Sequence, residues 1–317
     1  MVFPPPLRPG DAVRVVAPSA SFDADAFERG LSVLSSRLGL RPRVRPDIAS
    51  QHGYLAGDDA RRIEEWREAV ADPEARAIFC ARGGYGAMRI LQAVDPAPLL
   101  DRPKLLVGFS DVTALHAALN RAGLVTVHGP VVTQLGRAPE DALLHLEALL
   151  SGRAPRSGPW DAPAPGAGLV GTGTLRPGRA TGPLLGGNLT LLAHLLGTPF
   201  APRFDGAILF LEDVGEKPYR IDRDLTQLRL AGALDHLAGV AVGQLVSCDD
   251  AGVEGMAVVR EAVAALGVPA IEGLPAGHED RNLALPLGAR ATLVAPGAPG
   301  SGDEGPPRLL FDEGAVR

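Results

Sequence analysis

The chain has 317 residues, of which 46% are hydrophobic and 21% charged, a balance typical of globular domains and too apolar for an intrinsically disordered protein. This length predicts about two domains. The net charge of −6 is spread along the chain without a basic cluster, which argues against nucleic acid or an anionic membrane as the main partner.

Residues 1–150 predict an α/β domain with a largely parallel sheet, because short apolar runs alternate with amphipathic helical patterns. The expected strands are 12–17, 41–44, 77–80, 105–109 and 125–128. The expected helices are 25–38, 58–70, 88–94, 111–122 and 139–150. Five such strand–helix steps indicate a flavodoxin-like open sheet.

Residues 151–183 interrupt this pattern and are expected to connect two domains. They hold 8 glycines and 6 prolines, too many for the interior of a helix or a central strand. Residues 184–317 then predict a second, smaller, mixed α/β domain. Its expected helices are 188–196, 222–234 and 255–266, and its expected strands are 207–211, 239–246, 291–294 and 309–311.

A serine stands at the junction of a buried strand and a helix. The apolar run 105–109 leads directly into Ser110, and the helix expected from Asp111 starts at once. Open α/β sheets place their active sites at the carboxyl ends of parallel strands, and free N–H groups at a helix start can stabilise an oxyanion. Serine is also a preferred N-cap residue. This segment alone therefore leaves a nucleophile and a helix cap as open interpretations.

The strand expected at 77–80 is followed by a glycine-rich turn, ARGGYG. The spacing of Gly83, Gly84 and Gly86 matches neither the GxGxxG fingerprint nor the GxxxxGK[ST] phosphate loop. Glycine permits a close approach of the backbone to a ligand. We therefore regard Gly84 as a candidate for binding an oxyanion or a substrate backbone, with a plain tight turn as the alternative.

Two acidic residues, Glu212 and Asp213, follow the apolar run 207–211. Most acidic side chains are solvated. Glu212 directly continues the apolar run, so we expect it to be partly buried and to have a partner. Asp222 is expected to cap the helix that comes after the next loop.

Seven histidines are available as a general base. His278 lies in a loop stiffened by neighbouring glycines and prolines. His116 lies on the helix after Ser110, and six residues of helix place it about 9 Å along the axis, beyond hydrogen-bond reach. His128 is the main rival, because it would also lie at the carboxyl edge of the sheet. The other four occur in a loop or in helical patterns and have no special role in this interpretation.

Neither a metal nor a cofactor is expected. His278 and Glu279 are followed by Asn282 where an HExxH motif has its second histidine. Cys80 and Cys248 lie far apart, without the spacing of a zinc knuckle or a disulfide scaffold. The N-terminus lacks the pattern of a signal peptide, and no apolar run is long enough to span a bilayer. We therefore expect a soluble, cytoplasmic protein.

Five segments, in chain order, together resemble the LD-carboxypeptidases, also called muramoyltetrapeptide carboxypeptidases. They are RGGYG, GFSDVTALH, GGNLTLLAHLLGTP, FLEDVGEKPYRIDRDLTQL and GHEDRNLALPLGARATL. The similarity extends from Ala17 to Thr292, nearly the whole chain, and the ordered set is specific where one block would not be. It implies two domains with the active site in the cleft between them.

The resemblance also implies a serine peptidase triad, with Ser110 as nucleophile, Glu212 as the orienting carboxylate and His278 as general base. The backbone N–H groups of Gly84 and Asp111 match the family's oxyanion hole. His128 matches a family position, but not that of the base. A homodimer is the family expectation.

The reaction implied by this resemblance releases the terminal D-alanine from cytoplasmic murein tetrapeptides during peptidoglycan recycling. The free carboxylate of that residue needs a cationic or N–H partner. Arg82 and Arg220 are the candidates for this contact.

Three alternatives remain open. A related branch, resembling the microcin C immunity proteins, uses the same triad on aminoacyl-nucleotide peptides. Trp160 is the candidate for its aromatic platform for a base, with an ordinary surface or linker tryptophan as the favoured alternative. The IDRDLTQL and NLALPLG segments favour the murein branch. A binding module without catalysis is a second alternative, although mere binding does not require this triad. The third is a nucleotide-dependent enzyme that uses RGGYG.

Overall fold

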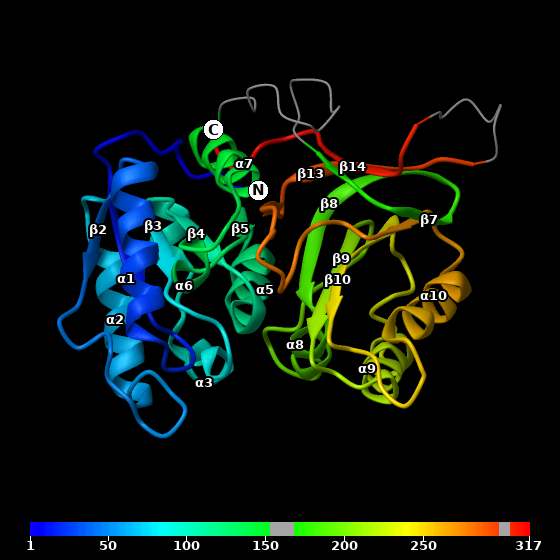
Figure 1. Ribbon diagram of the computed structural model, residues 1–317, viewed down its shortest axis with the longest axis horizontal. Coiled ribbons are helices and arrows are strands. Elements are labelled where there is room, and N and C mark those ends of the chain that lie inside the picture. Colours follow the sequence, from blue (N-terminus) through cyan, green and yellow to red (C-terminus); the bar gives the residue numbers. More distant parts are fainter. Residues whose placement is uncertain (153–167, 298–304) are drawn as a thin grey trace.

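The computed structural model describes residues 1–152, 168–297 and 305–317, which form two α/β units side by side (Figure 1). Each unit is built around its own sheet, one of six strands and one of eight. Among the described residues, no helix has the length and apolar character needed to cross a membrane.

Five of the six strands of the first sheet are parallel and have the order β2-β1-β3-β4-β5, and this confirms the flavodoxin-like prediction. Their bounds are β1 Ala12–Val16, β2 Arg41–Val44, β3 Ala75–Cys80, β4 Leu105–Gly108 and β5 Thr126–His128. Strands β4 and β5 are buried along their whole length because both faces of the sheet are covered there, whereas the edge strand β2 is exposed or half-buried.

Helices cover the two faces of this sheet. On one face the buried side chains of α1 and α7 pack with alternate strand residues such as Val15 and Phe79. On the other face α2 and α5 pack with the intervening residues such as Ile78 and Leu106. The helix bounds are α1 Ala24–Ser32, α2 Asp59–Ala71, α3 Ala87–Ile90, α4 Ala97–Asp101, α5 Thr113–Ala122, α6 Val132–Leu135 and α7 Glu140–Ser151.

The second sheet has the order β6-β14-β13-β8-β9-β10-β11-β7, in which β8 to β11 are parallel and the remaining pairs antiparallel. Its strands are β6 Leu169–Val170, β7 Gly173–Arg176, β8 Gly178–Asn188, β9 Ile208–Val214, β10 Gly239–Val246, β11 Ala270–Glu272, β13 Arg290–Ala295 and β14 Arg308–Phe311. Its helices are α8 Leu189–His194, α9 Pro218–Leu230 and α10 Gly255–Leu266.

The expectation that residues 151–183 only connect two domains is wrong for the part from residue 169 onward. These residues form strands β6, β7 and β8, and β8 lies in the middle of a sheet. Gly182 of β8 is needed because the backbone of another segment packs closely against it. A Cβ on Gly182 would lie 2.1 Å from the carbonyl oxygen of Gly206. Pro183 ends the antiparallel pairing of β8 with β13, and parallel pairing with β9 begins at the next residue. Trp160 lies outside the described residues.

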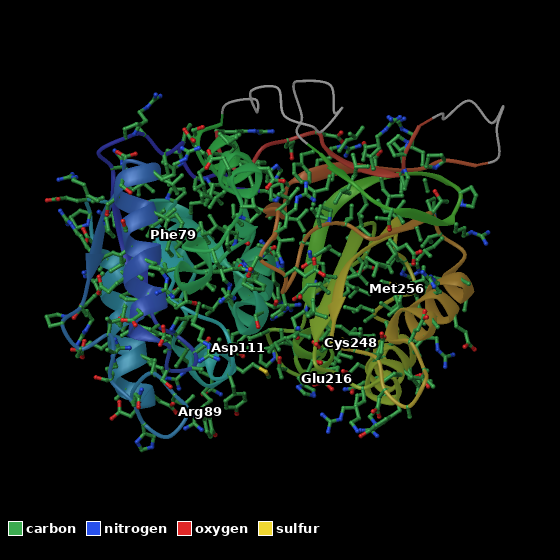
Figure 2. All side chains as sticks on the ribbon, in the orientation of Figure 1. Phe79, Arg89, Asp111, Glu216, Cys248 and Met256 are labelled. Carbon is green, nitrogen blue, oxygen red and sulfur yellow. The ribbon has the colours of Figure 1, made fainter. Side chains whose placement is uncertain are left out.

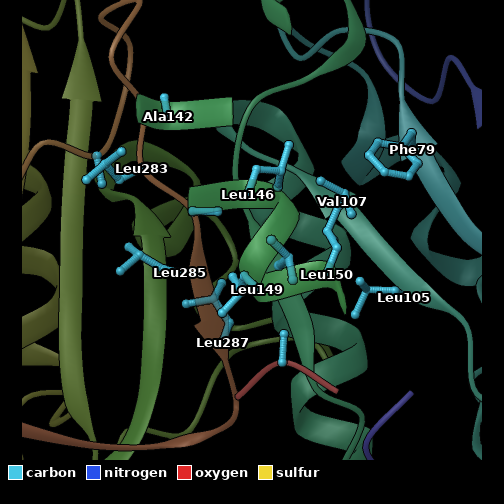
Figure 3. Close-up of a cluster of buried hydrophobic side chains, with 14 of the residues drawn as sticks. Phe79, Leu105, Val107, Ala142, Leu146, Leu149, Leu150, Leu283, Leu285 and Leu287 are labelled. Carbon is cyan, nitrogen blue, oxygen red and sulfur yellow. The ribbon is translucent and has the colours of Figure 1, made fainter. Parts of the chain in front are cut away.

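The second half of the chain also contributes to the first sheet. Strand β12, Leu285–Leu287, pairs antiparallel with β5 at the edge of the first sheet, although 184–317 was expected to form the second domain alone. Figure 3 shows Leu283, Leu285 and Leu287 in one buried cluster with leucines of α7. The apolar core is therefore continuous between the two units.

A further correction concerns α9, which begins at Pro218 rather than at Asp222. Proline suits the first helical position, because its missing N–H has no partner there and its fixed φ is helical.

Candidate active site

Ser110 occupies a sharp turn between β4 and the helical segment that leads into α5. Its φ is +64°, a left-handed conformation that costs energy for a residue with a side chain. The residues at the N-cap positions here are Phe109 and Val112, and neither cap uses a side-chain hydrogen bond. The capping interpretation of Ser110 is therefore wrong, and its hydroxyl is available for another contact.

The hydroxyl of Ser110 contacts His278, and His278 contacts Glu212. The Oγ atom of Ser110 lies 3.0 Å from Nε2 of His278, while Nδ1 of the same ring lies 2.6 Å from Oε2 of Glu212. These residues come from the end of β4, the loop before β12 and strand β9. The structure thus brings together all three side chains that the sequence predicted for the site.

The electrostatic surroundings favour a directed proton transfer. Glu212 is fully buried, and burial raises the pKa of its carboxyl group, while the hydrogen bond with His278 acts in the opposite direction. A carboxylate at Nδ1 holds the ring proton on that nitrogen, which leaves Nε2 as the acceptor for a hydroxyl proton. The side chain of His278 is 15% exposed, so the group can reach a ligand.

The absence of a side chain at Gly83 leaves space for the side chain of Ser110. A Cβ at this position would lie 2.7 Å from Cβ and 3.0 Å from Oγ of Ser110. The RGGYG pattern contained this signal, but sequence reasoning assigned a role only to the neighbouring Gly84.

The backbone N–H groups of Gly84 and Asp111 flank this position in the chain. Gly84 has a φ of +98°, and its N–H donates to no other group in the described ranges. Asp111 lies in the first turn of a helical segment, where N–H groups have no acceptor within the helix. Both donors are available to a ligand.

The carboxylate of Asp111 has a different task, which is to hold the glycine-rich turn. It is buried and accepts a hydrogen bond of 2.7 Å from the N–H of Ala87, and burial raises its pKa. From α2, the buried guanidinium of Arg62 donates to the carbonyl oxygens of Pro18 and Gly86. Nothing in the spacing of the sequence pointed to Arg62.

Two other histidines lie near the sheet edge without reaching Ser110. His116 is buried, bonded through Nε2 to the carbonyl oxygen of Gly108 at 2.8 Å, and burial lowers its pKa to about 4. His128 is buried between the rings of Phe109 and Phe210, with centroid separations of 5.7 and 5.0 Å. Burial lowers the pKa of His128 well below its usual value. His278 is therefore the imidazole at Ser110, and the rival is a neutral packing residue.

The second acidic residue of the pair, Asp213, is structural. It is buried and accepts hydrogen bonds of 2.8 Å from Nδ2 of Asn188 and from Oγ1 of Thr190 at the start of α8.

Asp111 and Glu216, which follow Ser110 and Glu212 in the chain, lie toward the same end of the two units (Figure 2).

The two candidate arginines are exposed and do not touch the three central side chains in the described part of the chain. Arg82 donates to the carbonyl oxygen of Ser21 at 2.5 Å. Nη1 of Arg220, on α9, lies 3.4 Å from Oε2 of Glu216. The described residues also contain no cluster of three or more His, Cys, Asp or Glu side chains suited to a metal ion.

Comparison with known proteins identifies relatives along nearly the whole chain. Models of the N-terminal and C-terminal domains of LD-carboxypeptidases match residues 13–129 and 181–293. A putative carboxypeptidase of Streptomyces coelicolor is 42% identical over 308 residues, which cover 93% of this chain and 94% of the relative. The murein tetrapeptide carboxypeptidase of Pseudomonas aeruginosa is 35% identical over 290 residues, covering 89% and 92% of the two chains.

Solved structures share the architecture. The muramoyltetrapeptide carboxypeptidase from Oxalobacter formigenes superposes with a TM-score of 0.80 at 29% identity, over 95% of this chain and 99% of that one. The microcin C7 self-immunity protein, solved with glutamyl sulfamoyl guanosine, has a TM-score of 0.85 over the full length of both chains, and at 22% identity this shows a common fold. Matches to both domain models, together with relatives above 30% identity over nine-tenths of the sequence, show that this chain belongs to the LD-carboxypeptidase family.

Proposed function

We propose that this protein is a serine carboxypeptidase that releases the terminal D-alanine from murein tetrapeptides by hydrolysing the L,D amide bond. The observation that carries the proposal is the hydrogen-bonded line from Ser110 through His278 to the buried Glu212, with contacts of 3.0 and 2.6 Å. A hydroxyl, an imidazole and a carboxylate in this order form the constellation that activates a serine for acyl transfer. The name of the Pseudomonas aeruginosa relative supports the choice of substrate.

In the first half of the reaction, Oγ of Ser110 attacks the carbonyl carbon that joins the L-configured centre to D-alanine. Nε2 of His278 takes the hydroxyl proton, and Glu212 stabilises the imidazolium that forms. The negative charge that develops on the carbonyl oxygen is held by the N–H groups of Gly84 and Asp111. The C–N bond then breaks as the imidazolium gives its proton to the leaving amine.

In the second half, water attacks the acyl-enzyme ester. His278 takes a proton from the water and returns it to Oγ of Ser110 as the ester bond breaks. The products are D-alanine and a shortened peptide with a new carboxyl group, and the enzyme is restored.

We assign recognition of the terminal carboxylate to Arg82 or Arg220. Arg82 belongs to the same turn as Gly84, and Arg220 follows the β9 strand that carries Glu212, so both come from segments that build the site. Their guanidinium groups are exposed, and a planar guanidinium can bind a carboxylate through two hydrogen bonds.

The second candidate function is cleavage of aminoacyl-nucleotide peptides. The common fold with the microcin C7 self-immunity protein favours keeping it in the test. Both candidates use the same three side chains and differ in what the rest of the cleft accepts.

Mass spectrometry of the products from a substrate panel tests the proposal. The panel contains a murein tetrapeptide, the same peptide ending in D-alaninamide, and an aminoacyl-nucleotide conjugate. We expect D-alanine release from the tetrapeptide, much slower cleavage of the amide, and no release by Ser110→Ala. Cleavage of the conjugate alone would favour the second candidate, and the absence of any product would overturn both.

We also propose that the enzyme acts in the cytoplasm as a homodimer during peptidoglycan recycling. Cell fractionation and light scattering of the purified protein test these two points.

A further inference from the structure

The catalytic imidazole lies on a segment without regular secondary structure. Residues 273–284 leave β11 of the second sheet and reach β12 of the first sheet without forming a helix or strand. Backbone hydrogen bonds to β10 hold Leu274 and Ala276, but within the described ranges none of them holds His278 itself. Contacts of 2.6 and 3.0 Å on opposite sides of one ring nevertheless require a well-defined ring position.

We propose that Gln134 and Gln244 are positioning residues that hold this segment from the two sides of the domain interface. Their side-chain amides bind the peptide groups of the residue after His278, and so keep the imidazole between Ser110 and Glu212. The inference rests on the proposed function and adds two residues outside the triad.

Gln134, on α6 of the first unit, is buried and uses both ends of its amide. Its Nε2 donates to the carbonyl oxygen of Glu279 at 2.7 Å, and its Oε1 accepts from Nδ2 of Asn282 at 3.2 Å. Asn282 is also buried, and its Oδ1 accepts from the N–H of Gly277 at 3.0 Å. This chain of amides reaches the backbone on both sides of His278.

Gln244, on β10 of the second unit, completes the arrangement. Its Oε1 accepts from the N–H of Glu279 at 2.9 Å, and its Nε2 donates to the carbonyl oxygen of Arg281 at 3.0 Å. Gly277 makes the close approach possible, since a Cβ there would lie 3.0 Å from Cβ of Gln244. The N–H and the carbonyl of Glu279 are thus held by amides from opposite domains.

These contacts need a donor and an acceptor on the same side chain, and glutamine supplies both. A glutamate at position 134 would turn a carboxylate oxygen toward the carbonyl of Glu279. A methionine would leave that carbonyl and the buried Nδ2 of Asn282 without this partner. A buried polar group left without a partner is costly, so we expect the peptide groups beside His278 to shift in such a variant.

The same loop carries two ion pairs that we exclude from this role. Arg137 pairs with Asp280, and Asp141 with Arg281, each at 2.6 Å. The side chains of the first pair are 61% and 60% exposed, and exposed pairs contribute little to stability. Asp280→Asn therefore provides a matched control on the same segment.

The test measures the rate at which a serine-directed phosphonate labels Ser110, together with kcat and KM for D-alanine release. Labelling does not depend on recognition of a murein peptide. For Gln134→Met and Gln244→Met we expect the labelling rate and kcat to fall about 10- to 100-fold, with KM changed by less than about threefold. Asp280→Asn should stay within about twofold of the wild type.

Gln134→Glu supplies a readout that a purely structural role would not change. When protonated, its carboxyl group again has one donor and one acceptor. The ratio of its labelling rate to that of the wild type should therefore rise as the pH is lowered. Because every other side chain is the same in the two proteins, the ratio isolates position 134.

The outcomes separate this inference from the proposed function. If the wild type is labelled and the folded methionine variants react at the wild-type rate, the positioning role is overturned while the triad stands. A ratio for Gln134→Glu that is flat with pH also overturns it, and this holds even if a methionine variant fails to fold. No labelling of the wild type would overturn the triad and the positioning role together.

Discussion

Ser110 and His278 face each other at 3.0 Å, yet the chain holds them by different means. Ser110 belongs to a junction between a buried strand and a helical segment that lie next to each other in the chain. His278 lies in a loop between two sheets, where its ring contacts Glu212 of β9 and the next residue, Glu279, is bound by side chains of α6 and β10.

This difference separates local from long-range determinants of one site. The strand, the turn and the helix start around Ser110 occupy adjacent residues, so a short segment specifies them. The hydrogen bond between Gln134 and Glu279 joins residues 145 positions apart. We expect changes on the serine side to act through local sterics, and changes on the histidine side to act through domain packing.

Removal of the Ser110 hydroxyl or of the His278 imidazole should have the largest effect on activity. We expect Ser110→Ala, His278→Ala and the double variant each to lower kcat for D-alanine release by about 10⁴-fold or more. The two residues act as a unit, so the double variant should be no worse than the single ones. Additive losses in steady-state kinetics would show that they act in separate steps.

Glu212→Gln should lower kcat by about 10³- to 10⁴-fold, because an amide does not stabilise the imidazolium as a carboxylate does.

Burial raises the pKa of Glu212 in the folded state, so its ionised form opposes folding at pH values above that pKa. The variant should therefore be more stable to urea than the wild type at pH 8.

This gain should disappear as the pH falls below about 4, because the wild-type carboxyl group is then mostly protonated in both the folded and the unfolded state. Urea unfolding at several pH values, followed by circular dichroism, measures it. A lower stability of the variant at pH 8 would show that the bond with His278 outweighs the cost of burial.

Gly83→Ala tests the serine side through sterics alone. The added methyl group would lie 2.7 Å from Cβ of Ser110, so the hydroxyl must move and kcat should fall about 10- to 100-fold. Gly314→Ala is the control, because its nearest neighbour atom would be 3.8 Å away. Equal activity of both variants would refute a steric requirement at the turn.

Ser110→Gly should sharpen the comparison by a smaller effect on stability. At a φ of +64°, glycine avoids the clash of a Cβ, so this variant should be about 1 kcal/mol more stable than Ser110→Ala. Ser32, at a φ of −61° near the end of α1, should show the reverse order, with alanine favoured over glycine by about 1 kcal/mol. Thermal unfolding of Ser110→Gly, Ser110→Ala, Ser32→Gly and Ser32→Ala measures both differences.

Sequence patterns predicted much of this arrangement. Alternating strands and helices up to residue 150 indicated the parallel sheet, and the junctions after two apolar runs indicated Ser110 and Glu212. The resemblance to a family added His278 as the base in place of His128. The glycine-rich segment was misread at β8, since glycine marks both loops and close backbone contacts, and composition does not separate the two.

The amino-acid sequence by itself determined which segments become strands and helices of the first domain, and which short segments carry the hydroxyl and the carboxylate, because those features depend on the periodicity and conformation of adjacent residues. Tertiary structure alone decided that β12 joins the first sheet, that His128 is buried between two phenylalanines, and that Gln134 and Gln244 meet at Glu279. Such contacts depend on how two separately formed layers pack, and no spacing within one segment encodes that geometry.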